Sequence, residues 1–196
     1  MTRIAVLVSG GGTNLQALIN AQEEGSLGGG ILSLVVSSKP GAAALDRAKK
    51  AGIPSITIEK KKIAPRFDEA LAAVLLEHRI DLVVLAGFLT VLGSEVLHSF
   101  ENRIINVHPA LIPSFCGKGF YGLKVHEAAL EYGVKVTGAT VHFVNEAIDG
   151  GRIILQKAVN VLPGDTSESL QQRVMREAEW DILPRAVAML CRGEII

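Results

Sequence analysis

Cysteine is scarce in this sequence, which has two cysteines among its 196 residues. Cys116 and Cys191 lie far apart, and two cysteines are too few for a disulfide framework or a cysteine-rich zinc motif. A secreted disulfide scaffold is therefore excluded. We expect a reducing, cytoplasmic location and no metal site.

An excess of one charge is also missing, because 20 Lys and Arg residues balance 20 Asp and Glu residues. This balance gives no electrostatic reason to expect nucleic acid or an anionic membrane as a partner. No apolar run reaches the roughly 18 residues of a membrane-spanning helix, and the run before the first glycines is too short for a signal peptide. We expect a protein that acts on small molecules, as a monomer or a homodimer, without a nucleic-acid or membrane partner.

Hydrophobic residues, in contrast, make up 48% of the chain, which is enough for a sizeable core. Over the first two thirds of the sequence, short apolar runs alternate with amphipathic stretches. Near-continuous apolar strands separated by helices indicate a mostly parallel sheet with helices on both faces. We therefore expect an α/β fold with a doubly wound, Rossmann-like sheet. The expected strands are residues 3–8, 31–36, 54–58, 81–87 and 103–108, and the expected helices are residues 14–25, 41–52, 67–79 and 94–101.

The pattern changes after residue 122. A helix is expected over 122–133, followed by two strands at 134–145 and 152–162 that only six residues connect. So short a connection predicts an antiparallel pair, because a parallel pair needs a crossover. A long helical segment over 166–192 closes the chain, with a bend expected near Pro184. We expect residues 1–196 to form a single domain.

A glycine loop, SGGGTNLQ at residues 9–16, stands between the first expected strand and helix. In a doubly wound fold this turn offers backbone N–H groups and a helix dipole to an anion. A dinucleotide fingerprint would need glycine at Leu15 and an acidic residue after the second strand, and a P-loop would need lysine after Gly12. The loop therefore suits one terminal phosphate, with Thr13 and Asn14 as side-chain donors.

A tight turn capped by Thr13 or Asn14 is the structural alternative for this loop. Three glycines followed by two small polar residues favour the phosphate interpretation.

The stretch INVHPALIPSF, residues 105–115, ends an apolar strand with two polar side chains. Asn106 and His108 are two residues apart, so they lie on one face of the strand, and Pro109 ends it. If the later strand pair packs beside this strand, Asp149 in AIDGG can approach them. An amide donor, a protonatable imidazole and a carboxylate suit acyl-type transfer, in which an oxyanion is stabilised and the carboxylate keeps the histidine charged. Ordinary structural roles for all three remain open from spacing alone.

Five segments together resemble the glycinamide ribonucleotide formyltransferases, folate-dependent enzymes of the purine pathway. They are RIAVLVSGGGTNLQALI, DLVVLAGFLTVL, INVHPALIPSF, GATVHFVNEAIDGGRIILQ and GDTSESLQQRV, and in this order they cover nearly the whole chain. Their N-x-H-P-x-L-x-P and D-x-G elements are specific. The resemblance implies transfer of a formyl group from N10 of 10-formyltetrahydrofolate, as co-substrate, to the glycine amine of 5-phosphoribosylglycinamide.

The resemblance also implies which residues form the site. It implies a catalytic triad, a loop for the phosphate and ribose of the substrate, and a folate pocket that reads the pterin edge largely through backbone groups. The triad would be Asn106, His108 and Asp149. The phosphate and ribose would be bound by Gly11, Gly12, Thr13, Asn14 and Glu179. The folate pocket would be formed by Leu89, Thr90, Val91, Leu92, Asn145, Glu146, Ala147 and Ile148.

The sequence departs from that family in three places. The family often has an arginine near position 64 that approaches the folate tail, where this chain has Ala64, so Arg66 becomes the candidate for that contact. Trp180 follows Glu179 where the family has histidine, and Trp180 is expected in the core or a pocket wall. Between Arg173 and Glu179 this chain has one additional residue.

Three other features receive smaller roles. His142 lies close in the chain to the expected folate loop and is left with a supporting role, whereas His126 is expected to be structural. The segment 116–122, rich in glycine, is expected to form a mobile loop over the substrate. The lysines at 60–62 are expected in a solvated loop.

Four alternatives have to be weighed. A formyltetrahydrofolate deformylase uses the same site with water, but relatives of that type carry a preceding regulatory domain, and the glycine loop here fits a phosphorylated acceptor. A methionyl-tRNA formyltransferase would need an additional nucleic-acid-binding domain. A nicotinamide oxidoreductase is opposed by the broken fingerprint. A phosphate-binding module without chemistry is the fourth alternative. Replacing His108 would distinguish it from an enzyme, because ligand binding would persist in both cases but only an enzyme would lose turnover.

Overall fold

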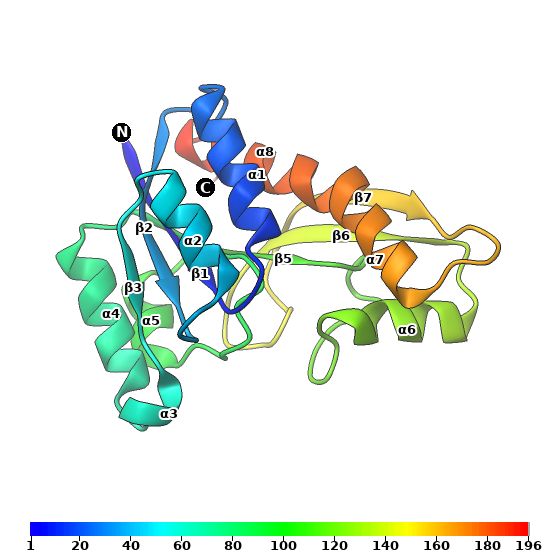
Figure 1. Cartoon of the computed structure of the whole chain (residues 1–196), viewed down its shortest axis with the longest axis horizontal. Coiled ribbons are helices and arrows are strands. Elements are labelled where there is room, and N and C mark those ends of the chain that lie inside the picture. The colour runs from blue at the N-terminus through cyan, green and yellow to red at the C-terminus, as the bar shows by residue number, and fades with distance from the viewer. Residues whose placement is uncertain (196) are drawn as a thin grey trace.

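The computed structural model describes residues 1–195 (Figure 1). Ile196, the last residue of the expected domain, lies outside the described residues. Within them, a seven-stranded sheet has the order β3-β2-β1-β4-β5-β6-β7. The strands are β1 (Thr2–Val8), β2 (Gly30–Ser37), β3 (Ser55–Thr57), β4 (Leu82–Leu85), β5 (Ile104–His108), β6 (Val136–Phe143) and β7 (Ile153–Asn160).

The first five strands pair in parallel, whereas β6 is antiparallel to both β5 and β7. The expected doubly wound sheet with an antiparallel C-terminal pair is therefore confirmed. The strand order reverses between β1 and β4, and in such sheets ligands bind beyond the carboxyl ends of the strands at this switch point.

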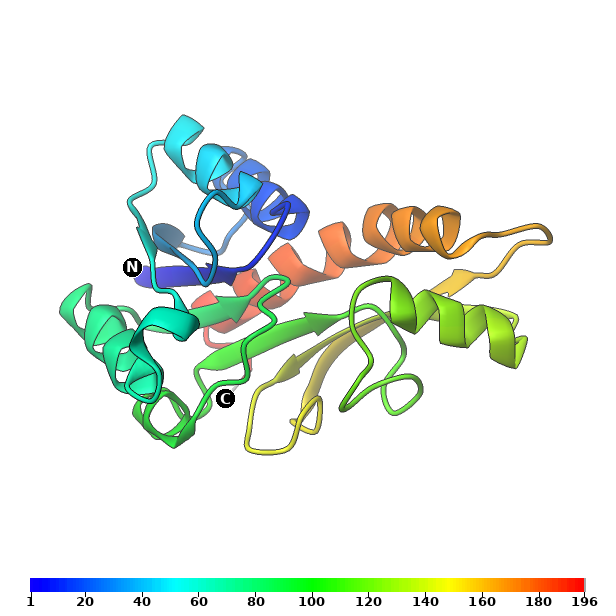
Figure 2. The same ribbon diagram turned by 60° about the horizontal axis from the view of Figure 1, so that its bottom comes forward.

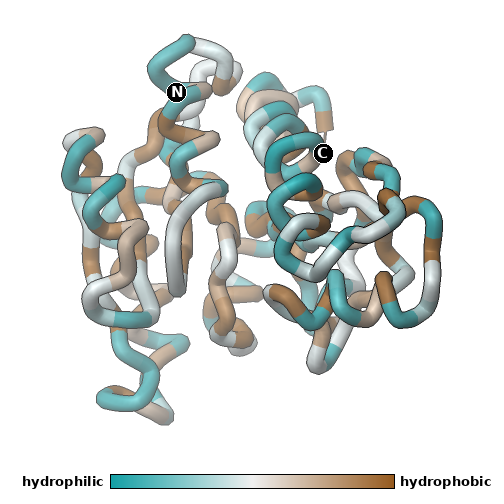
Figure 3. The backbone as a smooth tube through the Cα atoms, turned by 45° about the vertical axis from the view of Figure 1, so that its right-hand side comes forward, coloured by the Kyte–Doolittle hydropathy of each residue, from teal (hydrophilic) through white to brown (hydrophobic). Residues whose placement is uncertain are grey.

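Helices cover both faces of the sheet (Figure 2). Alternate residues of β1 separate the two cores: Ile4 and Val6 pack with α1, α2, α7 and α8, whereas Ala5 and Leu7 pack with α4 and α5. Hydrophobic colours accordingly follow the central strands in Figure 3. The helices are α1 (Thr13–Glu23), α2 (Ala43–Lys50), α3 (Lys60–Ile63), α4 (Phe67–Glu77), α5 (Ser94–Ser99), α6 (Leu123–Tyr132), α7 (Ser167–Val174) and α8 (Trp180–Cys191).

The long C-terminal helical segment is confirmed, and it is interrupted, although the interruption does not lie at Pro184. The interruption is a π-helix, η1 (Met175–Glu179), in which the N–H of Trp180 bonds to the carbonyl of Met175. Pro184 lies buried inside the helix that follows, α8. A π turn holds one more residue than an α turn, and η1 lies where the sequence has its additional residue. The carbonyl that the ring of Pro184 faces, and that its missing N–H cannot bond, is that of Trp180, the first residue of α8.

Two connections differ from expectation. The lysines at 60–62 form the short exposed helix α3, in which Lys62 pairs with Glu59 over 2.6 Å, instead of a loop. The β6–β7 connection has nine residues, 144–152, because β6 ends at Phe143. Gly151 is required there, since a Cβ would collide with the carbonyl of Phe143.

None of the helices in residues 1–195 is both long enough and apolar enough to cross a bilayer.

Candidate active site

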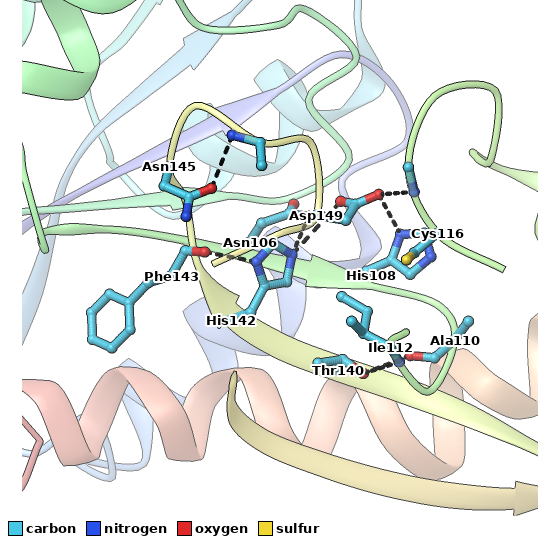
Figure 4. Close-up of polar contacts among 12 residues, drawn as sticks. Asn106, His108, Ala110, Ile112, Cys116, Thr140, His142, Phe143, Asn145 and Asp149 are labelled. Carbon is cyan, nitrogen blue, oxygen red and sulfur yellow. Dashed lines mark hydrogen bonds and ion pairs between the residues drawn. The ribbon is translucent and has the colours of Figure 1, made fainter. Parts of the chain in front are cut away.

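Asn106 and His108 lie at the carboxyl end of β5, and Asp149 reaches them from the β6–β7 connection (Figure 4). The Nδ1 of His108 is 3.6 Å from Oδ2 of Asp149, and their side chains are 5% and 11% exposed. So strong a burial protects this pair from solvent screening. The three residues that the sequence singled out are therefore neighbours in space.

His108 is held from two sides. Its Nε2–H donates to the carbonyl of Phe115 over 2.8 Å, because a carbonyl can only accept. The proton on Nε2 leaves Nδ1 facing the Asp149 carboxylate. A second proton, on Nδ1, would meet that carboxylate directly, so the geometry accommodates an imidazolium.

Asp149 is fixed by the backbone around it. Its φ is 54°, in the left-handed region that Asp tolerates better than most residues, and the N–H of Gly117 donates to Oδ2 over 2.8 Å. Two segments that are distant in sequence, the β6–β7 connection and the loop before α6, thus meet at one carboxylate oxygen.

The loop before α6 is packed over the site through Phe115. The Phe115 ring makes edge contacts with Phe120, at a centroid distance of 6.4 Å, and with Tyr132, at 6.0 Å. The segment 116–122 contacts Asp149 through Gly117, and its expected position over the substrate stays a prediction. Its motion stays a prediction.

Asn106 contacts His142, for which we expected only a supporting role. His142 stands directly opposite Asn106 in the β5–β6 ladder, and the Nδ2 of Asn106 lies 3.2 Å from its Nε2. His142 is 1% exposed, and burial lowers its pKa. Its Nε2 also lies 3.7 Å from Oδ1 of Asp149. The triad is thus a cluster of four side chains.

His126, on α6, is completely buried, and neither ring nitrogen has a hydrogen-bond partner among the described residues. Burial, with a smaller effect of the nearby His108, lowers its pKa to about 4. A neutral, buried imidazole agrees with the structural role expected for His126.

The glycine loop presents the N-terminus of α1. Gly12, at φ 72°, is the residue before the helix, and a Cβ there would lie 2.6 Å from the Cβ of Ala44. In the part of the chain that is described, no side chain caps this helix, so the capped-turn alternative with Thr13 or Asn14 is wrong. Uncapped N–H groups at the positive end of a helix favour an anion.

Thr13 and Asn14 bond to the C-terminal segment instead. Thr13 Oγ1 donates to the sulfur of Met175 over 3.7 Å, and Asn14 Nδ2 donates to Glu179 Oε2 over 2.6 Å. Burial raises the pKa of Glu179 to about 7. The Oδ1 of Asn14 is buried without a partner among residues 1–195. Glu179 therefore joins the glycine loop, as expected, but is itself only 6% exposed.

Arg47 is a member of this region that the sequence did not single out. From α2, its Nε donates to the carbonyl of Gly11 over 2.9 Å and its guanidinium donates to Gln16 over 3.0 Å. It braces the glycine loop and adds a positive charge. With Thr13 and Trp180, Arg47 lines a hollow of about 460 Å³ between α1 and α8, which places Trp180 in a pocket wall, as expected.

Two loops hold the residues expected to contact folate. Leu89, Val91 and Ile148 are 56%, 63% and 49% exposed, which is unusual for large apolar side chains. Thr90 is half-buried, and the Leu92 side chain packs into the core, so this side chain is not available to a ligand. Asn145, Glu146 and Ala147 are exposed beside Ile148.

The loop after β4 is tied to its neighbours. The N–H of Leu89 donates to the hydroxyl of Ser9 over 3.0 Å, which joins it to the glycine loop at the switch point. Asp68, on α4, accepts from the N–H of Gly93 over 2.7 Å. Arg66 lies two residues before Asp68 and is exposed, so it stands near the end of this loop.

Within residues 1–195, no group of three or more His, Cys, Asp or Glu side chains is placed to hold a metal ion.

Comparison with known proteins adds three findings. Residues 2–187 match the formyl transferase family. The chain is 38% identical over 197 residues to phosphoribosylglycinamide formyltransferase of Haemophilus influenzae, covering all of this chain and 90% of that protein. The structure of the present chain resembles that of glycinamide ribonucleotide transformylase 1 from Symbiobacterium toebii, with a TM-score of 0.94 and 43% sequence identity. The similarity covers 100% of this chain and 90% of that one.

A longer relative matches over one segment only. Trifunctional purine biosynthetic protein adenosine-3 of Drosophila melanogaster is 45% identical over 194 residues, which cover 97% of this chain. The chain spans 14% of the length of that relative.

Proposed function

This chain belongs to the formyl transferase family, as its motifs led us to expect, and we propose that it transfers the formyl group of 10-formyltetrahydrofolate to the amine of 5-phosphoribosylglycinamide. The products are the N-formyl compound and tetrahydrofolate, and the reaction serves purine biosynthesis. The relatives named for this reaction support the proposal, because similarity to them extends over 90% of their chains.

The observation that carries the proposal is the pairing of His108 with Asp149 beside Asn106. The buried contact of 3.6 Å between Nδ1 and the carboxylate supports a charged imidazole, and the Asn106 amide lies two residues away on the same strand face. These are the groups that an acyl-type transfer needs where negative charge develops.

The steps follow from the chemistry of the amine. The amine attacks the formyl carbon in its neutral form, since a protonated amine has no lone pair. The formyl oxygen becomes negative. The amide N–H of Asn106 donates to it, and His108 can donate from Nε2 once its hydrogen bond to the Phe115 carbonyl opens. A proton then passes from the attacking nitrogen to N10, through His108 or a water that Asp149 holds, and the C–N10 bond breaks.

We assign the phosphate of the acceptor to the uncapped N-terminus of α1. Gly11, Gly12, Thr13 and Asn14 would supply backbone and side-chain donors there, and Arg47 braces the loop. Glu179, bonded to Asn14, is the acceptor for the ribose hydroxyls.

We assign the folate to the two exposed loops. The apolar side chains of Leu89, Val91 and Ile148 give a surface for the pterin, and the backbone of residues 89–92 and 145–148 would read its polar edge. Arg66 is the candidate for the negatively charged tail. Within one unit, the phosphorylated acceptor would thus contact mainly the N-terminal half of the chain, whereas the folate would lie between loops from both halves, residues 89–92 and residues 145–148. A cytoplasmic location remains our expectation.

The test is tetrahydrofolate release, followed by absorbance, with and without 5-phosphoribosylglycinamide. We expect turnover only when the amine is present. His108→Asn should abolish it, whereas His98→Asn, on the exposed surface of α5, is the matched control and should not. Turnover without the amine would identify a deformylase that uses water. A folded protein with no turnover in either case would contradict both.

A further inference from the structure

We propose that His142 is a positioning residue, which fixes the amide of Asn106 with its nitrogen toward the reacting centre. The proposal rests on the proposed function, because it presumes that Asn106 donates to the formyl oxygen. It concerns a residue that takes no part in the reaction itself and acts through its neighbour.

The tautomer of His142 follows from one contact. Its Nδ1 lies 2.7 Å from the carbonyl of Phe143, the next residue in β6. A carbonyl can only accept, so Nδ1 must carry the proton. Burial of the ring lowers the pKa of His142, against the opposing effects of the Phe143 carbonyl and the Asp149 carboxylate, and this favours the neutral imidazole. The Nε2 therefore holds a lone pair and is an acceptor.

That lone pair decides the orientation of Asn106. An amide at a strand end can turn by 180°, exchanging oxygen and nitrogen, and sterics hardly separate the two states. With the amide oxygen toward Nε2, two acceptors would face each other across 3.2 Å. The Asp149 carboxylate, 3.7 Å from the same Nε2, also disfavours an oxygen there. Only the orientation with the amide nitrogen toward His142 forms a hydrogen bond.

The consequence concerns the second N–H of the same amide. One N–H of Asn106 is used by His142, and the other stays free to donate to a developing oxyanion. Because β5 and β6 pair at Asn106 and His142, the histidine is held in place by the sheet itself. Donors that are oriented before the reaction stabilise charge without a reorganisation cost.

Two substitutions separate this role from a structural one. His142→Asn keeps a side-chain N–H near the position of Nδ1 for Phe143, but it has no acceptor at the position of Nε2. His142→Gln reaches that position with an amide that can accept. We expect kcat to fall by about 10- to 100-fold in His142→Asn, with KM for both substrates within about threefold. His142→Gln should recover most of the loss.

The Asn106→Ala background supplies the control. If His142 acts through Asn106, adding His142→Asn to Asn106→Ala should lower kcat little further. Equal losses in His142→Asn and His142→Gln, or an undiminished loss in the Asn106→Ala background, would overturn the proposal.

A spectroscopic measurement needs no turnover. Long-range 1H–15N correlation spectra of the wild type should show His142 neutral and protonated at Nδ1. If His142 is instead protonated at Nε2, the positioning role is refuted. If Asn106→Ala has lost turnover at the same time, the proposed function still stands. If instead Asn106→Ala retains wild-type turnover, the assumed role of Asn106 fails, whatever the tautomer of His142.

Discussion

Asn14 donates to Glu179 across 2.6 Å, so the first turn of α1 is joined to a π-helix 165 residues later in the chain. Both side chains are buried, and the glutamate has no positive partner in this contact. The glycine loop is therefore stabilised from the C-terminal segment as well as from its own strand.

This contact predicts a pH dependence of stability. The folded-state pKa of Glu179 is raised from 4.5 to about 7, so the native state holds a proton that the unfolded state releases earlier. Its contribution is fully present below about pH 4.5 and is lost as the pH rises through 7. Between pH 5 and pH 8 the wild type should lose up to about 3 kcal/mol relative to Glu179→Gln, as measured by urea unfolding. Parallel stability profiles of the two proteins would contradict this prediction.

Asp149→Asn should lower kcat by about a thousandfold or more, because the neutral amide no longer supports a charged His108. KM for 5-phosphoribosylglycinamide should change little, since the glycine loop is untouched. Glu101→Gln, exposed after α5 and outside the proposed site, serves as the control for steady-state kinetics. Turnover at the wild-type rate in Asp149→Asn would remove this carboxylate from the mechanism.

Gly12→Ala should weaken both stability and phosphate binding. The residue has φ 72°, and its new Cβ would meet the Cβ of Ala44 at 2.6 Å, so the loop must shift at a cost of about 1 to 3 kcal/mol. Gly10→Ala is a matched control, because Gly10 is not among the assigned phosphate donors and, among the described residues, no heavy atom lies within 4 Å of a Cβ there. Thermal unfolding and KM for the phosphorylated substrate should change in the first variant and hardly in the second.

Val91→Asp should raise KM for the folate by about tenfold, because a charge would replace apolar surface on the loop after β4. KM for the phosphorylated amine should stay nearly constant. Leu76→Asp is the control: Leu76 is similarly exposed, at 54% against 63% for Val91, but it lies near the end of α4 away from this loop. An equal effect of both substitutions on folate KM would refute the assignment of this loop.

Local patterns explain why much of the fold, and the proximity of Asn106 and His108, could be predicted, whereas the catalytic role of these residues came from the resemblance to the family and stays a prediction. The i, i+2 spacing of Asn106 and His108 and the proline after them fix their common face. Asp149 could be placed only because a short connection requires an antiparallel pair. The pairing of His142 with Asn106 depends on the register between two strands, which nothing local in the sequence determines.

Arg47 and the π-helix were missed for similar reasons. An arginine on an amphipathic helix is ordinarily a surface residue, and its contact with Gly11 arises only when α2 packs beside the loop. The additional residue before Glu179 indicated an irregularity, but proline was the stronger local signal and pointed to the wrong position.

The hydrogen bond from His108 to the Phe115 carbonyl joins the imidazole to the loop before α6. As long as this bond is intact, the proton on Nε2 is held by the backbone and cannot pass to a substrate atom. If His108 delivers a proton from Nε2, as the proposed function allows, this hydrogen bond has to break first. The edge contacts of the Phe115 ring with Phe120 and Tyr132 help to hold the carbonyl, and with it that proton, in place.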